Sequence, residues 1–251
     1  MSIFDEELTI RYKYIQYKFD VDGIEINDTY RRYCRSLSKV DSFCQPHIQG
    51  LPLFYNIRDH VNVVFSDKKP HYGERYNDDT FSDVLILGEY VASHSKFGEC
   101  IILYINNIHK CATSELPFEA LMLDVYTHEL YHAYFRSGAN YILDVEEPLA
   151  EFGAMFLLEA MASMGVIDDC VVKQCLGYVR NKTKLPKYSF GAYIYSKHQD
   201  YANWKMGILL NHYRIKVQNS DLMDLTDIST EYPEKWDEAY DKLCKALNYV
   251  D

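Results

Sequence analysis

The strongest constraint on the fold of this 251-residue chain is a change of hydrophobic pattern at Pro117. Before it, β-branched and aromatic residues cluster between turn residues and predict strands in three segments: "VNVVF" (61–65), "VLILGEYVA" (84–92) and "CIILYINNI" (100–108). After it, apolar residues recur at helical spacing and prolines stand where helices can begin, so that candidate helices cover 117–136, 148–164, 166–181, 188–198, 201–218 and 233–249. The sequence therefore predicts an α+β fold with a small N-terminal β-sheet and an α-helical C-terminal half.

The first part of the chain is expected to form a β-hairpin followed by a helix. Apolar and polar residues partly alternate through 10–26, and Asp22-Gly23 is a turn signal between extended segments. Residues 29–40 are the candidate helix. We therefore expect three segments packed as one unit: an N-terminal hairpin and helix (1–58), a core with the remaining strands and the first helices (59–165), and a helical C-terminal part (166–251).

Charge and cysteine content narrow the function classes. The chain carries 26 basic and 37 acidic residues, a net charge of −11, which does not favour nucleic acid or an anionic membrane as a partner. An apolar leader and a run of roughly 20 apolar residues are both lacking, so we expect neither secretion nor membrane insertion. Seven cysteines without a Cys-x-x-Cys pair fit reduced thiols, and the expected location is the cytoplasm. Composition does not constrain the oligomeric state.

The segment "VYTHELYHAYF" (125–135) contains the pattern His-Glu-x-x-His. On a helix, His128 and His132 lie on one stripe about 6 Å apart along the axis, where two ring nitrogens can bind one zinc ion. Glu129 lies about 100° around, within reach of a water on that ion. By chance the string arises in roughly one chain in a hundred of this length, but the uncharged flanks without proline or glycine favour a buried helix that carries a metal site.

A catalytic zinc ion needs a third protein ligand and an open position for water. The metzincin continuation is excluded, because Phe135 and Gly138 occupy the places of its glycine and third histidine. The next candidate helix reads "DVEEPLAEFGAMFLLEA" and offers four carboxylates: Glu146, Glu147, Glu151 and Glu159. The residues alone leave the choice among them open.

A His-Glu-x-x-His helix followed by a helix that supplies a glutamate resembles the gluzincin metallopeptidases. Eighteen residues separate His132 from Glu151, as in the aminopeptidase branch of that clan, so the resemblance implies Glu151 as the third ligand. Glu147 is the alternative, because Glu147-Pro-Leu-Ala-Glu151 resembles the Glu-x-x-Ala-Asp element of another branch. If Pro148 is the first helical residue, Glu147 stands at the cap, which favours Glu151 and leaves Glu147 to orient an imidazole.

The resemblance covers roughly residues 84–160 and implies a zincin-like fold. In this clan an edge strand before the motif helix holds the peptide substrate, and "CIILYINNI" is expected to be that strand, the alternative being an ordinary interior strand. The Gly-x-Met-Glu-Asn element of the aminopeptidases and the Asn-Glu-x-x-Ser-Asp element of the thermolysin branch are both missing. Aminopeptidase activity and thermolysin-like specificity are therefore not carried over.

The function expected from these residues is zinc-dependent hydrolysis of peptide bonds in a peptide or protein substrate. A metal-activated water attacks the carbonyl, and Glu129 acts as general base. A second donor usually stabilises the oxyanion, and "LPKYSFGAYIYSKH" (185–198) offers Tyr188, Tyr193, Tyr195 and His198, of which Tyr193 is our choice. The alternative function is a zincin-fold protein that binds metal for regulation or interaction and has no general proteolytic activity.

Overall fold

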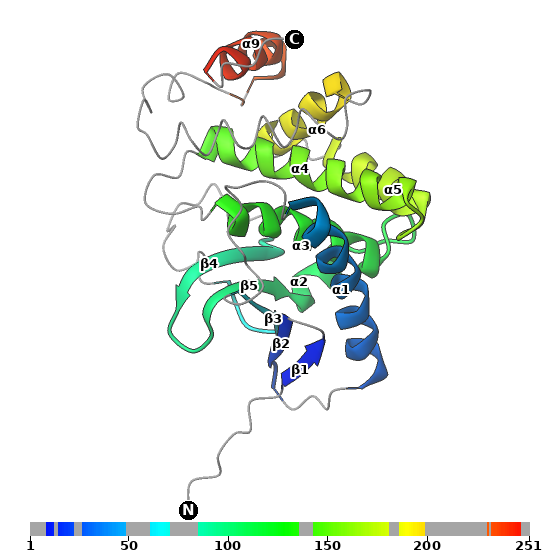
Figure 1. Ribbon diagram of the computed structural model, residues 1–251. Coiled ribbons are helices and arrows are strands. Elements are labelled where there is room, and N and C mark those ends of the chain that lie inside the picture. The colour runs from blue at the N-terminus through cyan, green and yellow to red at the C-terminus, as the bar shows by residue number, and fades with distance from the viewer. Residues whose placement is uncertain are drawn as a thin grey trace, which may run out of the picture. The chain divides into compact units, whose positions relative to one another are not determined.

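The computed structural model describes residues 9–12, 15–22, 27–48, 61–70, 85–135, 143–180, 186–198, 230 and 232–246. The described elements mix strands and helices, which confirms the α+β class (Figure 1). The chain divides into two compact units, one of residues 1–49 and 55–133 and the other of residues 50–54 and 134–251. Within the described ranges, no helix has the length and apolar character needed to cross a membrane.

The first unit contains a sheet whose strands are β1 (Thr9–Tyr12), β2 (Ile15–Asp20), β3 (Asn62–Ser66), β4 (Gly88–His94) and β5 (Gly98–Tyr104). Their order across the sheet is β1-β2-β3-β5-β4 (Figure 1). The pairs β2–β3 and β3–β5 are parallel, whereas the outer pairs β1–β2 and β4–β5 are antiparallel. Parallel strands in the middle of a sheet need both faces covered, which explains the apolar character of β3 and β5.

The predicted N-terminal hairpin is present, but its turn is not at Asp22-Gly23. The connection falls between Tyr12 and Ile15, because β2 continues to Asp20, which pairs with Ser66 of β3. Asp22 follows the strand, and its backbone N–H donates to the carboxylate of Asp67 at 3.0 Å. The turn signal therefore marks the exit from the second strand and not the bend between the two.

The prediction that "CIILYINNI" forms the edge strand is wrong. β5 lies between β3 and β4, and every residue from Cys100 to Tyr104 is buried, as expected of a strand covered on both faces. The strand also ends earlier than predicted, because Ile105–Cys111 forms the helix α2. Among the described strands, β4 is the edge of the sheet on this side.

Helix α1 (Asp28–Ile48) and residues 118–133 of helix α3 (Phe118–Phe135) belong to the same unit. The side chain of Asn27 caps α1 by accepting the backbone N–H groups of Thr29 and Tyr30. An aromatic cluster joins α1 to the sheet, with the rings of Tyr30 and Phe65 6.0 Å apart. The carboxylate of Asp41 on α1 accepts the hydroxyl of Tyr126 on α3 at 2.7 Å and the hydroxyl of Tyr17 on β2 at 3.2 Å.

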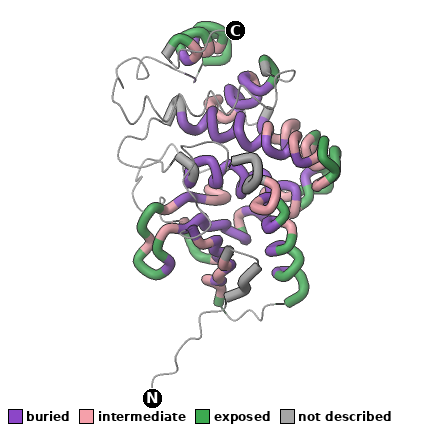
Figure 2. Tube along the Cα trace, in the orientation of Figure 1, coloured by how far each residue is buried: buried purple, intermediate pink, exposed green. Residues whose placement is uncertain are grey.

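The second unit is helical. It contains α4 (Leu143–Ser163), α5 (Asp169–Arg180), α6 (Pro186–His198), the short 3-10 helix η5 (Pro233–Lys235) and α9 (Trp236–Ala246). Helix α4 packs against both α5 and α6 and is buried along most of its length, whereas α5 is mostly half-buried or exposed (Figure 2). Gly165, with a positive φ of 68°, follows α4 at the place where the chain turns away from the helix. The predicted helix 201–218 lies outside the described residues.

Candidate metal centre

The histidine pair is carried by a helix that is buried on every side. Residues 120–133 of α3 are all buried, which explains why this segment shows almost no polar face. His128 is 7% and His132 is 6% exposed. Their Nε2 atoms lie 3.0 Å apart, and their ring planes are inclined by 67°. The sequence-based prediction that both imidazoles converge on one side of the helix agrees with this geometry.

The distance between the two ring nitrogens suits a shared metal ion. Zinc–nitrogen bonds of about 2.0–2.1 Å in tetrahedral geometry place two ligand nitrogens about 3.3 Å apart. The observed 3.0 Å is close to that separation, and in both rings it is Nε2 that faces the other. The spacing of the two nitrogens is therefore compatible with a shared metal ion.

The helix that supplies the carboxylates begins earlier than the sequence suggests. Helix α4 starts at Leu143, so Pro148 lies inside the helix and not at its first position. A proline at this sixth position lacks the N–H that would donate to the carbonyl of residue 144, so the helix continues through it at the cost of one backbone hydrogen bond. Glu147 consequently lies a full turn inside α4. Glu147 is therefore not the cap of this helix, and the prediction that favoured Glu151 on that ground is wrong.

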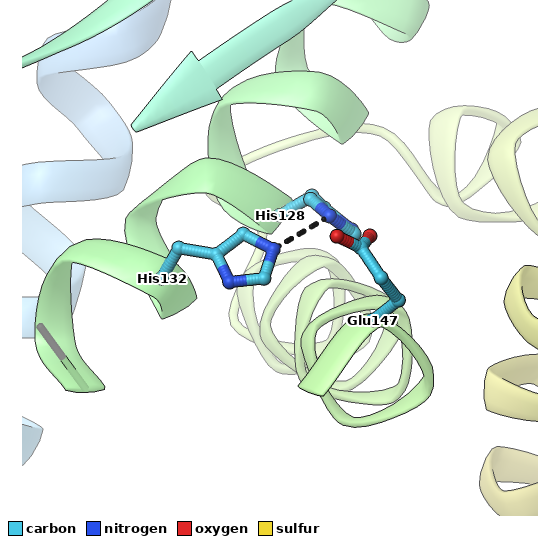
Figure 3. A group of neighbouring side chains, drawn as sticks. All are labelled: His128, His132 and Glu147. Carbon is cyan, nitrogen blue, oxygen red and sulfur yellow. Dashed lines mark hydrogen bonds between the residues drawn. The ribbon is translucent and has the colours of Figure 1, made fainter. Parts of the chain in front are cut away.

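The structure brings Glu147 together with the two histidines (Figure 3). One ligand atom from each of His128, His132 and Glu147 lies within 4.8 Å of the others, and all three side chains are buried. Glu151 is buried but is not a member of this group, and its Cβ faces Gly191 of α6. The geometry thus favours Glu147, the alternative ligand of the sequence analysis, over Glu151.

Glu129 lies against the first residue of the edge strand. A Cβ atom added to Gly88 of β4 would lie 3.1 Å from Cγ of Glu129 and 2.6 Å from Cγ1 of Val125. Glu129 is buried, and it is placed about 100° around α3 from His128. It is therefore near the histidine pair without being part of the group of ligand atoms, and its role as general base stays a prediction.

Tyr193 does not face the helix that carries the glutamates. Gly191 marks the side of α6 that packs on α4, and Tyr193 lies about 200° around the helix from it. Its hydroxyl donates to the carboxylate of Asp237 on α9. Burial and this hydrogen bond raise the pKa of Tyr193. The choice of Tyr193 as the oxyanion donor is therefore not supported, whereas Tyr195 lies near the side of Gly191 and is buried.

Gly88, which lies against Glu129, was not among the site residues predicted from the sequence. It stands inside the apolar run "VLILGEYVA". A glycine within a strand is a signal for close approach by another backbone or side chain, so the position could have been found. What the sequence does not reveal is that the approaching side chain is Glu129.

Two imidazole nitrogens and one carboxylate oxygen form a donor set that is typical of catalytic zinc sites, in which a fourth position stays open for water. The set fits zinc better than magnesium or calcium, which prefer oxygen ligands. No family model, curated protein or solved structure matches the chain.

Proposed function

We propose that the protein is a zinc-dependent metallopeptidase of gluzincin type, with His128, His132 and Glu147 as its metal ligands. The observation that supports this most strongly is the convergence of the three buried donor atoms within 4.8 Å. The order of the ligands, with two histidines on one helix and a glutamate on the next, also agrees with the resemblance on which the proposal rests.

In this proposal, the bound zinc would act as a Lewis acid that polarises the scissile carbonyl and makes a neighbouring water more acidic. Glu129 accepts the proton that the water loses as its oxygen attacks the carbonyl carbon. The C–N bond then breaks, and Glu129 donates the same proton to the leaving amine. One water is consumed, and Glu129 returns to its ionised form.

The proposed substrate is an extended peptide bound along β4. This strand pairs with β5 on one side, and no described strand pairs with its other side. The main-chain groups of an edge strand can hold a peptide as an additional strand. Because Gly88 at the start of β4 lies against Glu129, a peptide on this edge would run close to the proposed base.

The metal content of the purified protein and of three variants tests the ligand set. We expect about one zinc per chain in the wild type and in Glu151→Ala, and loss of zinc in His132→Ala and Glu147→Ala, because a zinc ion that keeps only two of its three protein ligands is bound much more weakly. If Glu151→Ala loses the metal and Glu147→Ala keeps it, the ligand assignment is wrong. A wild type that takes up no stoichiometric zinc, even when zinc is supplied, would reject the metallopeptidase proposal.

Replacing Glu129 by Gln separates the enzyme from a metal-binding interaction protein. The isosteric amide cannot accept the proton, so we expect hydrolysis of a mixed peptide library to fall by about 10²- to 10⁴-fold while zinc stays bound. Glu119→Gln is the matched control, because Glu119 stands in the first turn of the same helix and forms an exposed ion pair with Arg32. Undiminished hydrolysis in Glu129→Gln contradicts the mechanism. A zinc-loaded wild type that cleaves no peptide supports the alternative function.

A further inference from the structure

Gly88 is a glycine for steric reasons. A Cβ atom at this position would lie 2.6 Å from Cγ1 of Val125, 3.1 Å from Cγ of Glu129 and 3.2 Å from the carbonyl oxygen of Ile102. Its backbone does not lie in the left-handed region, unlike that of Gly98, whose φ is 69° and whose added Cβ would meet nothing within 4 Å. The absence of a side chain at Gly88 therefore serves the packing and not the backbone conformation.

The backbone around Gly88 cannot easily retreat from α3. Gly88 pairs with Leu103 of β5, and the preceding residue, Leu87, accepts the backbone N–H of Tyr104 at 2.9 Å. The carbonyl oxygen of Ile86 accepts the side-chain amide of Asn107 at 2.8 Å. An added methyl group would thus lie between the fixed backbone of β5 and the side chains of α3. The residues of α3 would therefore have to move.

The two side chains of α3 that face Gly88, Val125 and Glu129, differ in how easily they can change conformation. Val125 is β-branched and has one strongly preferred rotamer in a helix, so it resists rotation. Glu129, one turn further along, has rotatable bonds beyond Cβ, and a displacement at Cγ is carried on to its carboxylate. The 2.6 Å contact with Val125 can be relieved only if this part of α3 moves away from β4, and Glu129, one turn further along and itself 3.1 Å from the added atom, would be displaced with it.

We propose that Gly88 is a positioning residue for Glu129: the missing side chain lets the general base lie directly against the edge strand that holds the peptide. This inference rests on the proposed function. A misplacement of about 1 Å in a catalytic group can lower a rate by about 100-fold, so the effect of a single methyl group is measurable. The histidines do not contact the added group, and the metal should stay bound.

The test compares Gly88→Ala with wild type in crystal structures, in zinc content and in steady-state hydrolysis of a peptide that the wild type cleaves. We expect the Glu129 carboxylate to be displaced, zinc to stay at about one per chain, and kcat to fall about 10- to 100-fold with little change in KM. In the Glu129→Gln background, Gly88→Ala should lower the residual kcat no further, because both changes act through the same group. Gly177→Ala is the control, since its added Cβ meets nothing within 4 Å.

Two results would overturn the inference. One is a Glu129 side chain that superimposes on that of the wild type in the Gly88→Ala structure. The other is a loss of kcat that is equally large in the Glu129→Gln background, which would indicate a general structural effect. If Gly88→Ala does not fold, the double variant Gly88→Ala/Val125→Ala removes the closest contact and leaves the contact with Glu129, so the same comparisons apply. Failure of the proposed function is recognised separately, because then the wild type itself binds no zinc or cleaves no peptide.

Discussion

Replacing Gly191 by alanine should loosen the packing of α6 on α4. The added Cβ atom would lie 2.6 Å from Cβ of Glu151, 2.6 Å from the carbonyl oxygen of Pro148 and 3.1 Å from the backbone nitrogen of Phe152. None of these atoms can move by rotation of a side chain, since all belong to the backbone or are attached to it directly. The two helices must therefore separate.

The size of the effect follows from these contacts. Carbon atoms in ordinary contact are about 3.5–4.0 Å apart, so the helices must move apart by about 1 Å. Overpacking of this kind costs about 1–3 kcal/mol, while the change from glycine to alanine within a helix contributes about 0.5–1 kcal/mol in favour of folding. We expect a net loss of about 1–2 kcal/mol in the free energy of unfolding.

The assay is thermal unfolding followed by far-ultraviolet circular dichroism, with Gly177→Ala of α5 as the control. For a chain of this size, 1 kcal/mol corresponds to roughly 2–4 °C in Tm, so Gly191→Ala should unfold about 2–8 °C below the wild type. Gly177→Ala adds a methyl group in open space, and its Tm should rise by about 1–4 °C. If the two variants shift Tm in the same direction and by the same amount, the close contact between α4 and α6 does not exist in solution.

Two further predictions concern charges and thiols. Hydrogen bonds from Tyr193 and Lys197 of α6 lower the pKa of Asp237 on α9. The ionised carboxylate therefore stabilises the contact between α6 and α9 above the unfolded pKa of about 3.9, and this stabilisation is lost as the pH falls through the folded pKa. Replacing Trp204 by Phe leaves Trp236 as the single tryptophan, and its fluorescence should change on acidification below about pH 4. Asp237→Asn should abolish this change in fluorescence. If the change persists in Asp237→Asn, it does not come from Asp237. Burial raises the pKa of the Cys34 thiol to about 12; the hydrogen bond with Asp168 also raises the pKa of the Cys170 thiol, but Cys170 is exposed to the reagent. Iodoacetamide at about pH 8 should accordingly alkylate Cys170 in the native protein and leave Cys34 unmodified, as peptide mass spectrometry would show, and equal labelling of both would refute the burial of Cys34.

Local patterns predicted the elements that depend on local interactions. The segment 117–136 differs by one residue at each end from α3, and 61–65 differs equally little from β3. In both cases the apolar spacing or the cluster of β-branched residues is uninterrupted, and the flanking residues end the element. The spacing of His128 and His132 likewise follows from the helix alone.

The predictions were wrong where packing between elements determines the start of a helix, the order of strands or the contacts of a side chain. Whether α4 starts at Leu143 or at Pro148 depends on whether burial of the residues before the proline offsets the lost hydrogen bond, and no local signal reports that balance. The order of β4 and β5 in the sheet is also not local, although the continuous burial of Cys100–Tyr104 agrees with an apolar run that is typical of an interior strand. For Tyr193, the helix was predicted, whereas its hydrogen bond with Asp237 of α9 joins residues 44 positions apart and has no local signal.

The carboxylate of Asp41 has a practical consequence for any attempt to shorten the protein. It accepts the hydroxyl of Tyr126, a residue 85 positions later in the chain and two before His128. A fragment that begins at residue 59 would contain both histidines and Glu147, yet it would expose the back of α3 and leave the phenol of Tyr126, which is 1% exposed in the whole chain, without this acceptor. A minimal fragment that keeps the environment of the proposed metal site therefore has to include α1 and β2, even though neither contributes a proposed ligand.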